Sequence, residues 1–258
     1  MGKFGGGELG YGADLDVLFI GENAKGAAEI IQAMNQAGAS GRCLDARLRP
    51  EGEAGPLACT LAAYEAYFQQ RGQLWEAQAL TRARPINGPL QEAFLKSAQA
   101  IWKRFGARPD LFAEIAAMLE RVARDRAGRD DFLEFKTGTG GLMQLEFFVQ
   151  AHQMRIGLWE PNTLRALSLL RERGVILRRT AELLSEHYRF LRRCEAVLRR
   201  MDNKGVSTLP ADGTGQMQLA KRCGFEDRER FLEQYRFSRG EIARVARLNG
   251  GEETAAVD

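Results

Sequence analysis

Apolar and polar positions follow two different patterns along the chain, and the first covers its N-terminal part. Residues 14–20 (DLDVLFI) form a short apolar run between glycine-containing turns, which predicts a strand. Residues 26–38 predict a helix whose apolar positions recur at helical spacing: Ala28, Ile31 and Met34. Residues 41–52 have mixed polarity and end in proline and glycine, which predicts a second strand that turns out toward solvent.

The second pattern is helical and begins at residue 60. Thr60 has a suitable side chain for the N-cap of a helix that ends near Gly72, and residues 73–84 predict the next helix. Residues 110–126 and 175–201 carry apolar side chains at steps of three and four, which is typical of amphipathic helices. After Pro89 no stretch predicts a sheet. The pattern therefore indicates an α/β part followed by an all-helical part.

Charge and cysteine content exclude several classes of function. The chain has 258 residues, 45% of them hydrophobic, and 37 basic against 34 acidic residues leave a formal charge of +3. So small an excess does not indicate a nucleic acid or an anionic membrane as the partner. The arginines of residues 175–201 fit a solvated face paired with glutamates, with an anion-binding surface as the alternative. No apolar run has the length of a membrane span or the pattern of a secretion signal, so we expect a cytoplasmic protein. A reducing compartment also fits the cysteines, which are far apart and form no CxxC pair: Cys43, Cys59, Cys194 and Cys223.

Two glycine-rich stretches resemble phosphate-binding motifs only in composition. Gly5, Gly7 and Gly10 satisfy the spacing G-x-G-x-x-G, with Glu29 further on, but a dinucleotide site needs a strand before the glycines and a helix after them. Residues 136–141 (KTGTGG) carry the lysine at the wrong end for a Walker motif. Neither stretch predicts a nucleotide site by itself.

The acidic residues at the start of the first strand are better candidates for chemistry. Residues two apart in a strand point to one face, so Asp14 and Asp16 are expected side by side. Two such carboxylates repel unless a cation lies between them, and Mg²⁺ takes one or two protein carboxylates together with phosphate oxygens. Asp45, in the next strand-like segment, would complete a two-metal site for phosphoryl displacement. The alternative is that Asp14 caps a turn and Asp16 is an edge residue, and the spacing of this pair alone favours that alternative.

Four segments in the same order resemble one catalytic half of the glutamine synthetase adenylyltransferases. They are GKFGGGELGYGADLD (2–16), LDARLRPEGEAGPL (44–57), LWEAQALTRAR (74–84) and KTGTGGLMQLEFFVQ (136–150). These bifunctional enzymes belong to the DNA polymerase beta-like nucleotidyltransferase superfamily. The helix-forming residues 188–201 and the STLP segment at 207–210 resemble the helical domain that follows in that family.

The resemblance implies a fold and a set of roles. The fold class would be α+β, with a nucleotidyltransferase domain of a small mixed sheet and helices over residues 1–95, N-terminally incomplete, and an all-helical domain over 96–258. Gly5 and Gly6 match a turn that approaches the triphosphate, and Asp14, Asp16 and Asp45 match the metal carboxylates. Candidates for phosphate or substrate contacts, with bracing salt bridges as the open alternative, are Arg47, Arg49, Arg82, Arg84 and Lys136.

Other residues of these segments are expected to pack. Trp75 and Glu76 fit interdomain packing and helix pairing better than chemistry. Glu146 and Gln150 are expected to join the helical part to the catalytic part.

The implied activity is Mg²⁺-dependent adenylyl transfer in the control of nitrogen assimilation. A tyrosine hydroxyl of glutamine synthetase would attack the α-phosphate of ATP, with Asp45 helping to deprotonate it. The other half of such enzymes reverses the reaction with phosphate and releases ADP. Since nothing resembling a second catalytic half follows, the sequence favours the adenylylating half weakly. A PII-type signalling protein is an implied further partner.

Three departures from the family pattern leave alternatives open. Ala13 replaces the usual serine before the first metal aspartate, Gln144 replaces an acid of the DIEF motif, and the chain begins abruptly at Met1. We expect a fragment of a longer polypeptide. It is either an active half that needs its missing portion or a degenerate homologue that binds nucleotide or glutamine synthetase without transfer. A transferase acting on a small molecule or an RNA end ranks lowest, because the shared motifs extend past the metal site.

Overall fold

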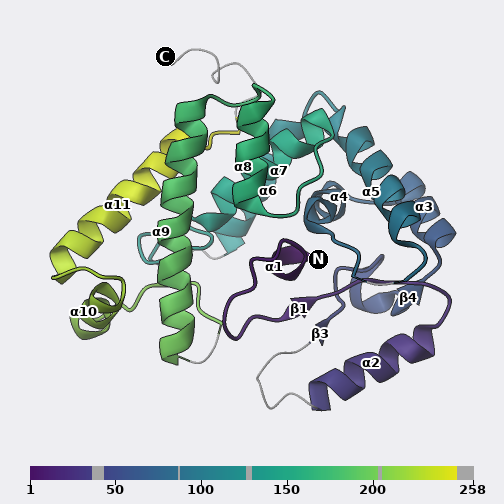
Figure 1. Cartoon of the computed structure of the whole chain (residues 1–258), viewed down its shortest axis with the longest axis horizontal. Coiled ribbons are helices and arrows are strands. Elements are labelled where there is room, and N and C mark those ends of the chain that lie inside the picture. Colours follow the sequence, from purple (N-terminus) through teal and green to yellow (C-terminus); the bar gives the residue numbers. More distant parts are fainter. Residues whose placement is uncertain (37–43, 87, 126–129, 203–204, 249–258) are drawn as a thin grey trace. The chain divides into compact units, whose positions relative to one another are not determined.

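The computed structural model of the chain describes residues 1–36, 44–86, 88–125, 130–202 and 205–248 (Figure 1). Its elements are α1 (Gly2–Gly5), β1 (Leu15–Asp16), β2 (Phe19–Ile20), α2 (Ala24–Gln36), β3 (Leu44–Asp45), η1 (Gly52–Ala54), β4 (Ala58–Cys59), α3 (Leu61–Gln70), α4 (Leu74–Ala79), η2 (Leu80–Arg82), α5 (Gln91–Gly106), α6 (Leu111–Asp125), α7 (Leu142–Ile156), α8 (Thr163–Glu172), α9 (Arg178–Asp202), α10 (Gly213–Arg222) and α11 (Arg228–Val245). Short parallel strands and many helices are consistent with the expected α+β class.

The chain forms two compact units, and the first is discontinuous in sequence. The first unit comprises Met1–Arg108 and Gln153–Asn162, and the second comprises Pro109–His152 and Thr163–Asp258. The later segment of the first unit is bound by the earlier one: the indole Nε1 of Trp159 donates to the Ala83 carbonyl at 3.0 Å, and Asn162 Nδ2 donates to the Gly6 carbonyl at 3.1 Å. The domain boundary expected at residue 95 stays a prediction.

The sheet of the first unit consists of two parallel pairs. β1 pairs with β3, where Leu15 faces Leu44 and Asp16 faces Asp45. β2 pairs with β4, where Phe19 faces Ala58 and Ile20 faces Cys59. The predicted strand over 14–20 is therefore present as two short strands with different partners.

Two details of the predicted strands and helices are wrong. Among the described residues, the strand predicted over 41–52 is present only at Leu44–Asp45, as β3, and residues 47–50 form turns and a bend; β2 pairs with β4, which the sequence pattern did not indicate. The helix over 26–38 is present as α2, but its buried residue is Ala27, whereas Ala28 is exposed and the Met34 side chain is 46% exposed. The reason is that α2 packs on the short strands β3 and β4, so only a narrow stripe of it is covered. Residues 37–43, including Cys43, lie outside the described residues.

Helix α3 of the first unit begins and packs as the sequence indicates. Thr60 caps α3, since its side-chain oxygen accepts a hydrogen bond from the Ala63 N–H at 3.1 Å. Tyr64 and Phe68 of α3 are buried, and the Tyr64 ring lies 5.9 Å from that of Phe94 on α5. Aromatic packing of this kind stabilises a unit with little sheet.

The second unit is a helical bundle built around α9. α9 packs against α8 and α11, and it buries most of the predicted apolar stripe (Leu184, Tyr188, Leu191, Cys194 and Leu198), whereas Met201 is half-buried. Arg178 on its exposed face pairs with Glu182 at 3.7 Å, as expected for a solvated face. Arg192 and Arg199 differ from that expectation, because they pair with the buried Glu195 and their side chains are only 19% and 12% exposed. Among the described residues after Pro89, the β-structure is a single isolated bridge between Glu134 and Thr208. In the part of the chain that the structure describes, no helix has the length and apolar character to cross a membrane.

The cap of α3 gives a direct test of the first unit. Replacing Thr60 by alanine removes the acceptor for the Ala63 N–H, and we expect the free energy of unfolding to fall by about 1 kcal/mol in urea denaturation. Thr60→Ser keeps the hydroxyl and is the matched control. Equal stability of the alanine and serine variants would contradict the capping role.

Candidate functional site

Strand pairing brings two of the three expected carboxylates together. Asp16 and Asp45 are register partners on the parallel strands β1 and β3. Partners in register point to the same face of a sheet, so the two charges are neighbours. Asp14 precedes β1 and its side chain is exposed.

The carboxylate of Asp45 is held by Arg47, two residues further along the chain. Oδ1 accepts hydrogen bonds from the Arg47 backbone N–H at 2.9 Å and from Nε at 3.0 Å, while Oδ2 accepts from Nε at 2.9 Å and from Nη2 at 2.5 Å. The side-chain hydrogen bonds from Arg47 lower the pKa of Asp45, although burial acts in the opposite direction. Asp45 raises the pKa of Arg47 in turn, and the nearby charge of Asp14 adds a smaller effect of the same sign. Arg47 thus lies in the field of two of the expected metal carboxylates.

The donor chemistry of this pair fits a hard cation. Mg²⁺ requires one or two carboxylates and fills its other positions with water and phosphate oxygens, which Asp16 and Asp45 on adjacent strands satisfy. Among the described residues, no group of three or more histidine, cysteine or acidic side chains is placed to hold a metal ion. The role of Asp14, Asp16 and Asp45 as three ligands therefore stays a prediction.

The expected phosphate-proximal glycines are needed for close packing. A Cβ atom on Gly5 would overlap the carbonyl oxygen of Arg82, and one on Gly6 would lie 2.6 Å from the Pro161 carbonyl oxygen. Gly5 ends the short helix α1, and both glycines are buried. This packing explains the glycines without a ligand, and their approach to a nucleotide stays a prediction.

The two arginines of the R-A-R run brace this N-terminal segment. Arg82 is buried, forms an ion pair with the buried Glu8 and donates to the Gly2 carbonyl at 3.2 Å. Arg84 donates from Nε to the Gly5 carbonyl at 2.9 Å. Their guanidinium groups donate hydrogen bonds to backbone carbonyls that are not paired with a strand. This is the bracing role that the sequence left open as the alternative to phosphate contact.

Arg49 braces its own loop in the same manner. Nη1 donates to the Ala46 carbonyl at 2.8 Å and Nε donates to the Gly55 carbonyl at 3.0 Å. These bonds fix the turn that follows β3 and carries Arg47. Trp75 is half exposed, and Glu76 accepts from the Tyr67 hydroxyl at 2.8 Å, so Glu76 pairs α4 with α3.

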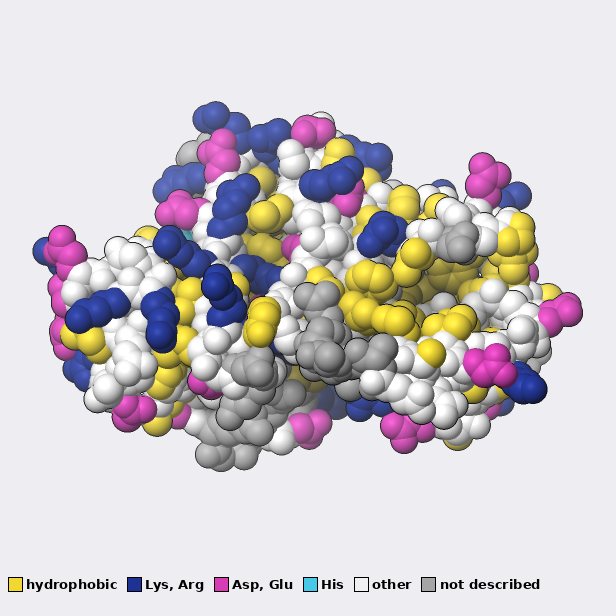
Figure 2. Space-filling view, turned by 60° about the horizontal axis from the view of Figure 1, so that its bottom comes forward, with side chains coloured by type: hydrophobic (Ala, Val, Ile, Leu, Met, Phe, Trp, Pro, Cys, Tyr) yellow, Lys and Arg dark blue, Asp and Glu magenta, His cyan; other side chains and the backbone are white. Residues whose placement is uncertain are grey.

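A cavity of about 520 Å³ opens beside Asp16 in the first unit, a size typical of ligand sites. Phe19, Ala27 and Ile30 give its wall an apolar character, and Arg84 also lines it. Figure 2 shows hydrophobic side chains gathered in a hollow on the right of the view. The sequence pattern did not indicate this cavity. One signal was available, because Ile30 is an apolar residue outside the predicted apolar stripe of α2. In the structure Ile30 is 51% exposed.

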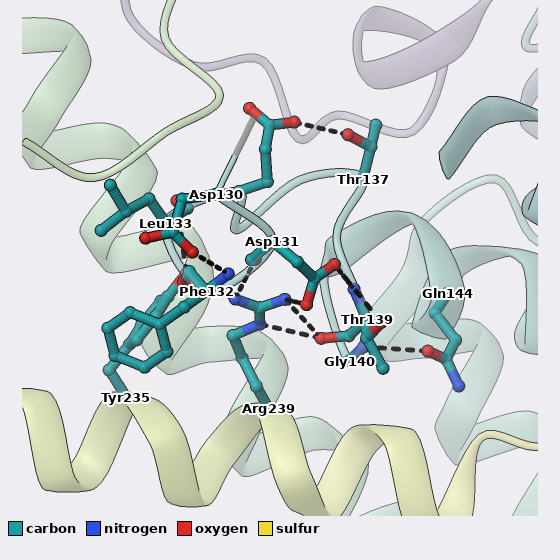
Figure 3. A network of polar contacts seen from close by, with 11 residues as sticks. Asp130, Asp131, Phe132, Leu133, Thr137, Thr139, Gly140, Gln144, Tyr235 and Arg239 are labelled. Carbon is teal, nitrogen blue, oxygen red and sulfur yellow. Dashed lines mark hydrogen bonds and ion pairs between the residues drawn. The ribbon is translucent and has the colours of Figure 1, made fainter. Parts of the chain in front are cut away.

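Lys136 belongs to the second unit, in a loop that Arg239 holds from α11 (Figure 3). The buried Arg239 guanidinium donates to the carbonyls of Asp131 at 2.6 Å and of Thr139 at 2.8 Å. Four successive backbone N–H groups of the loop have protein acceptors, since residues 138–141 donate to Glu134, Asp131, Gln144 and Gly138. A phosphate would find none of these four N–H groups available.

The side-chain amide of Gln144 forms hydrogen bonds through both its oxygen and its nitrogen in the second unit. Oε1 accepts from the Gly140 N–H at 2.9 Å, and Nε2 donates to the Ala246 carbonyl just beyond α11 at 3.2 Å. A carboxylate at this position would keep the first bond and lose the second. Glu146, two residues further along α7, accepts from the Tyr188 hydroxyl at 3.1 Å, and Gln150 is buried.

Comparison with known proteins finds two families along this chain. Residues 1–97 match the family described as glutamate-ammonia ligase adenylyltransferase, and residues 113–249 match the family described as GlnD PII-uridylyltransferase.

Similar proteins carry the name bifunctional glutamine synthetase adenylyltransferase/adenylyl-removing enzyme. The protein of Mycolicibacterium smegmatis is 34% identical over 97% of this chain and 28% of its own length. Those of Streptomyces avermitilis and Alteromonas mediterranea are 34% and 33% identical, over 87% and 97% of this chain and 25% and 27% of their own lengths. The chain thus spans about a quarter of the length of these relatives.

The packing of Gly5 can be separated from any ligand role. We expect Gly5→Ala to lower the free energy of unfolding by more than about 3 kcal/mol or to prevent folding, because its Cβ overlaps the Arg82 backbone. Gly7→Ala is the control: it has open space and carries only the cost of a positive φ of 65°, about 1 kcal/mol. Equal losses in urea denaturation would contradict the packing argument.

The amide of Gln144 predicts a pH-dependent variant. Gln144→Glu leaves the Ala246 carbonyl without its donor, so we expect a loss of about 1 kcal/mol at pH 7 relative to the natural chain. Protonation of the new carboxyl would give the Ala246 carbonyl a donor again. The loss should therefore shrink as the carboxyl is protonated at low pH, and thermal unfolding of both chains at pH 4.5 and pH 7 measures the difference. A loss that is independent of pH would show that the donor is unimportant.

Proposed function

Because the chain belongs to the glutamine synthetase adenylyltransferase family, we propose that it transfers AMP from ATP to a tyrosine of glutamine synthetase in a Mg²⁺-dependent reaction, in which the tyrosine oxygen bonds the α-phosphate and pyrophosphate leaves. The observation that carries the proposal is the 34% identity over 97% of the chain to a protein of that name. The register of Asp16 with Asp45 supports it, because the pair provides the hard oxygen donors that such a reaction needs. The reaction would serve the control of nitrogen assimilation in the cytoplasm.

The proposed roles follow from the contacts in the first unit. Asp16 and Asp45 hold the ion, with Asp14 as the third carboxylate; when bound, Mg²⁺ supplies Lewis acidity at the phosphate oxygens. The apolar wall of the cavity beside Asp16 takes the adenine ring. Arg47, with its side chain 67% exposed, contacts the triphosphate. Asp45 accepts the tyrosine proton, which requires Arg47 to leave it first, because the hydrogen bonds from Arg47 lower the pKa of Asp45 and weaken it as a base.

The remaining candidates are assigned by what they already contact. Arg82 and Arg84 position α1 and the start of the metal-binding segment, since their guanidinium groups bind its carbonyls. Arg49 positions the turn that carries Arg47. Gly5 keeps this segment close to the Arg82 backbone and Gly6 keeps it close to the Pro161 carbonyl. Lys136 is proposed as a substrate contact. The match of residues 113–249 to PII-uridylyltransferases supports a PII-type protein as a further partner.

A degenerate homologue is the second candidate function. Ala13 removes a hydroxyl next to Asp14, and Gln144 has turned an acidic position into a neutral brace between Gly140 and Ala246. Such a chain would bind nucleotide or glutamine synthetase without transferring AMP.

An adenylylation assay separates these candidates. We expect α-labelled ATP, Mg²⁺ and glutamine to give label on the cognate glutamine synthetase, with at least a hundredfold loss in Asp16→Asn, because removing one carboxylate impairs a metal-dependent step. Glu29→Gln removes an exposed acid of α2 and is the matched control, with activity unchanged.

Three other results would replace the proposal. ATP binding without any label indicates the degenerate homologue. Release of ADP from adenylylated glutamine synthetase in phosphate indicates the reverse reaction. Label on a small molecule or an RNA end in place of the synthetase indicates a different substrate.

A further inference from the structure

Arg47 places a positive charge next to the carboxylates of the first unit, as a bound cation would. Both oxygens of Asp45 accept from its guanidinium, at 2.9 Å and 2.5 Å for Oδ2 and 3.0 Å for Oδ1. The Asp45 side chain is only 14% exposed, so little solvent remains around the oxygens that Arg47 occupies. A metal ion and Arg47 therefore need the same lone pairs.

The surroundings make this contact useful in the absence of a cation. Asp16 and Asp45 are register partners, and like charges directly opposite each other destabilise a strand pair. Each of the two paired strands is only two residues long, so few hydrogen bonds oppose that repulsion. One positive charge at Asp45 lowers the net charge of the pair.

The Arg47 guanidinium can also move away from Asp45 into solvent. Its side chain is 67% exposed, and its guanidinium bonds the carboxylate of Asp45 from the solvent side of the turn. Its backbone N–H bonds Oδ1 of Asp45 at 2.9 Å and holds the carboxylate in place without the guanidinium. The neighbouring Arg49 differs, because its guanidinium is tied to the carbonyls of Ala46 and Gly55.

We propose that Arg47 is an internal counter-cation of the carboxylate pair, and that its guanidinium competes with a divalent cation for Asp45. This inference rests on the proposed function in that Asp45 is taken as a metal ligand. It adds a specific role for Arg47: the ion pair sets how tightly the chain holds the cation before any nucleotide arrives.

The test is cation binding by the full chain without ATP. Mn²⁺ is titrated into the protein and the signal of free Mn²⁺ is followed by electron paramagnetic resonance, with Mg²⁺ as competitor. We expect Arg47→Gln to bind Mn²⁺ about fivefold more tightly than the natural chain, because this variant lacks the guanidinium that competes for Asp45. Arg47→Lys keeps the positive charge but loses the planar guanidinium with its several donors. The Mn²⁺ affinity of this variant should lie between those of the natural chain and Arg47→Gln.

Two control variants separate competition at Asp45 from a general effect of charge. Arg71→Gln removes the same charge from another exposed arginine–carboxylate pair, Arg71 with Glu51 at 2.5 Å, and should leave Mn²⁺ affinity unchanged. In an Asp45→Asn background, the gain from Arg47→Gln should disappear, because the two residues then have nothing to compete for. Circular dichroism melts identify a variant that fails to fold, and Arg47→Lys then serves in place of Arg47→Gln.

The outcomes separate this inference from the proposed function. Equal or weaker Mn²⁺ binding by Arg47→Gln, together with weaker binding by Asp45→Asn, overturns the competition and leaves the metal site standing. Binding that does not depend on Asp45 in any variant overturns both. A gain in Arg71→Gln equal to that in Arg47→Gln shows a general charge effect and also overturns the competition.

Discussion

The first unit depends on a strand pairing that holds two carboxylates in register. β1 and β3 pair in parallel over two residues each, and this pairing fixes Asp16 opposite Asp45. Like charges directly opposite each other destabilise a strand pair, so a positive charge nearby stabilises it. Arg47, on the turn after β3, provides that charge through its ion pair with Asp45, and the Met1 ammonium lies in the field of Asp16.

Arginine side chains donate hydrogen bonds to backbone carbonyls that would be paired between strands in a larger sheet. Irregular segments leave backbone carbonyls without partners, and buried carbonyls need donors. Arg49, Arg82 and Arg84 supply them in the first unit, and Arg239 supplies them in the loop of the second. A guanidinium carries several donors in a fixed plane, so one side chain can satisfy two or three carbonyls at once. Arginines of the RLRP and RAR segments therefore have a structural role.

Features that depend on near neighbours could be predicted from the sequence, and those that depend on distant ones could not. The Thr60 cap and the apolar stripe of α9 arise from side chains within a few turns, and both are present. The pairing of β2 with β4 depends on the fold of the whole segment between them, and the local pattern does not contain it. Arg84 binds the carbonyl of Gly5, which no local pattern relates to it, so the sequence left bracing and phosphate contact equally open. The predicted buried side of α2 was wrong because its neighbours, and not its own periodicity, decide which stripe is covered.

The discontinuity of the first unit has a consequence for synthesis on the ribosome. Trp159 and Asn162 bind the carbonyls of Ala83 and Gly6, so the first unit lacks part of its own hydrogen bonding until residue 162 has emerged. By that time residues 109–152 of the second unit already exist, although α9 and α11 do not. The chain cannot finish one unit before starting the next, as domains contiguous in sequence do during translation. Both units are therefore incomplete at the same time on the nascent chain. The first is completed by residues 153–162 and the second by the residues that follow them.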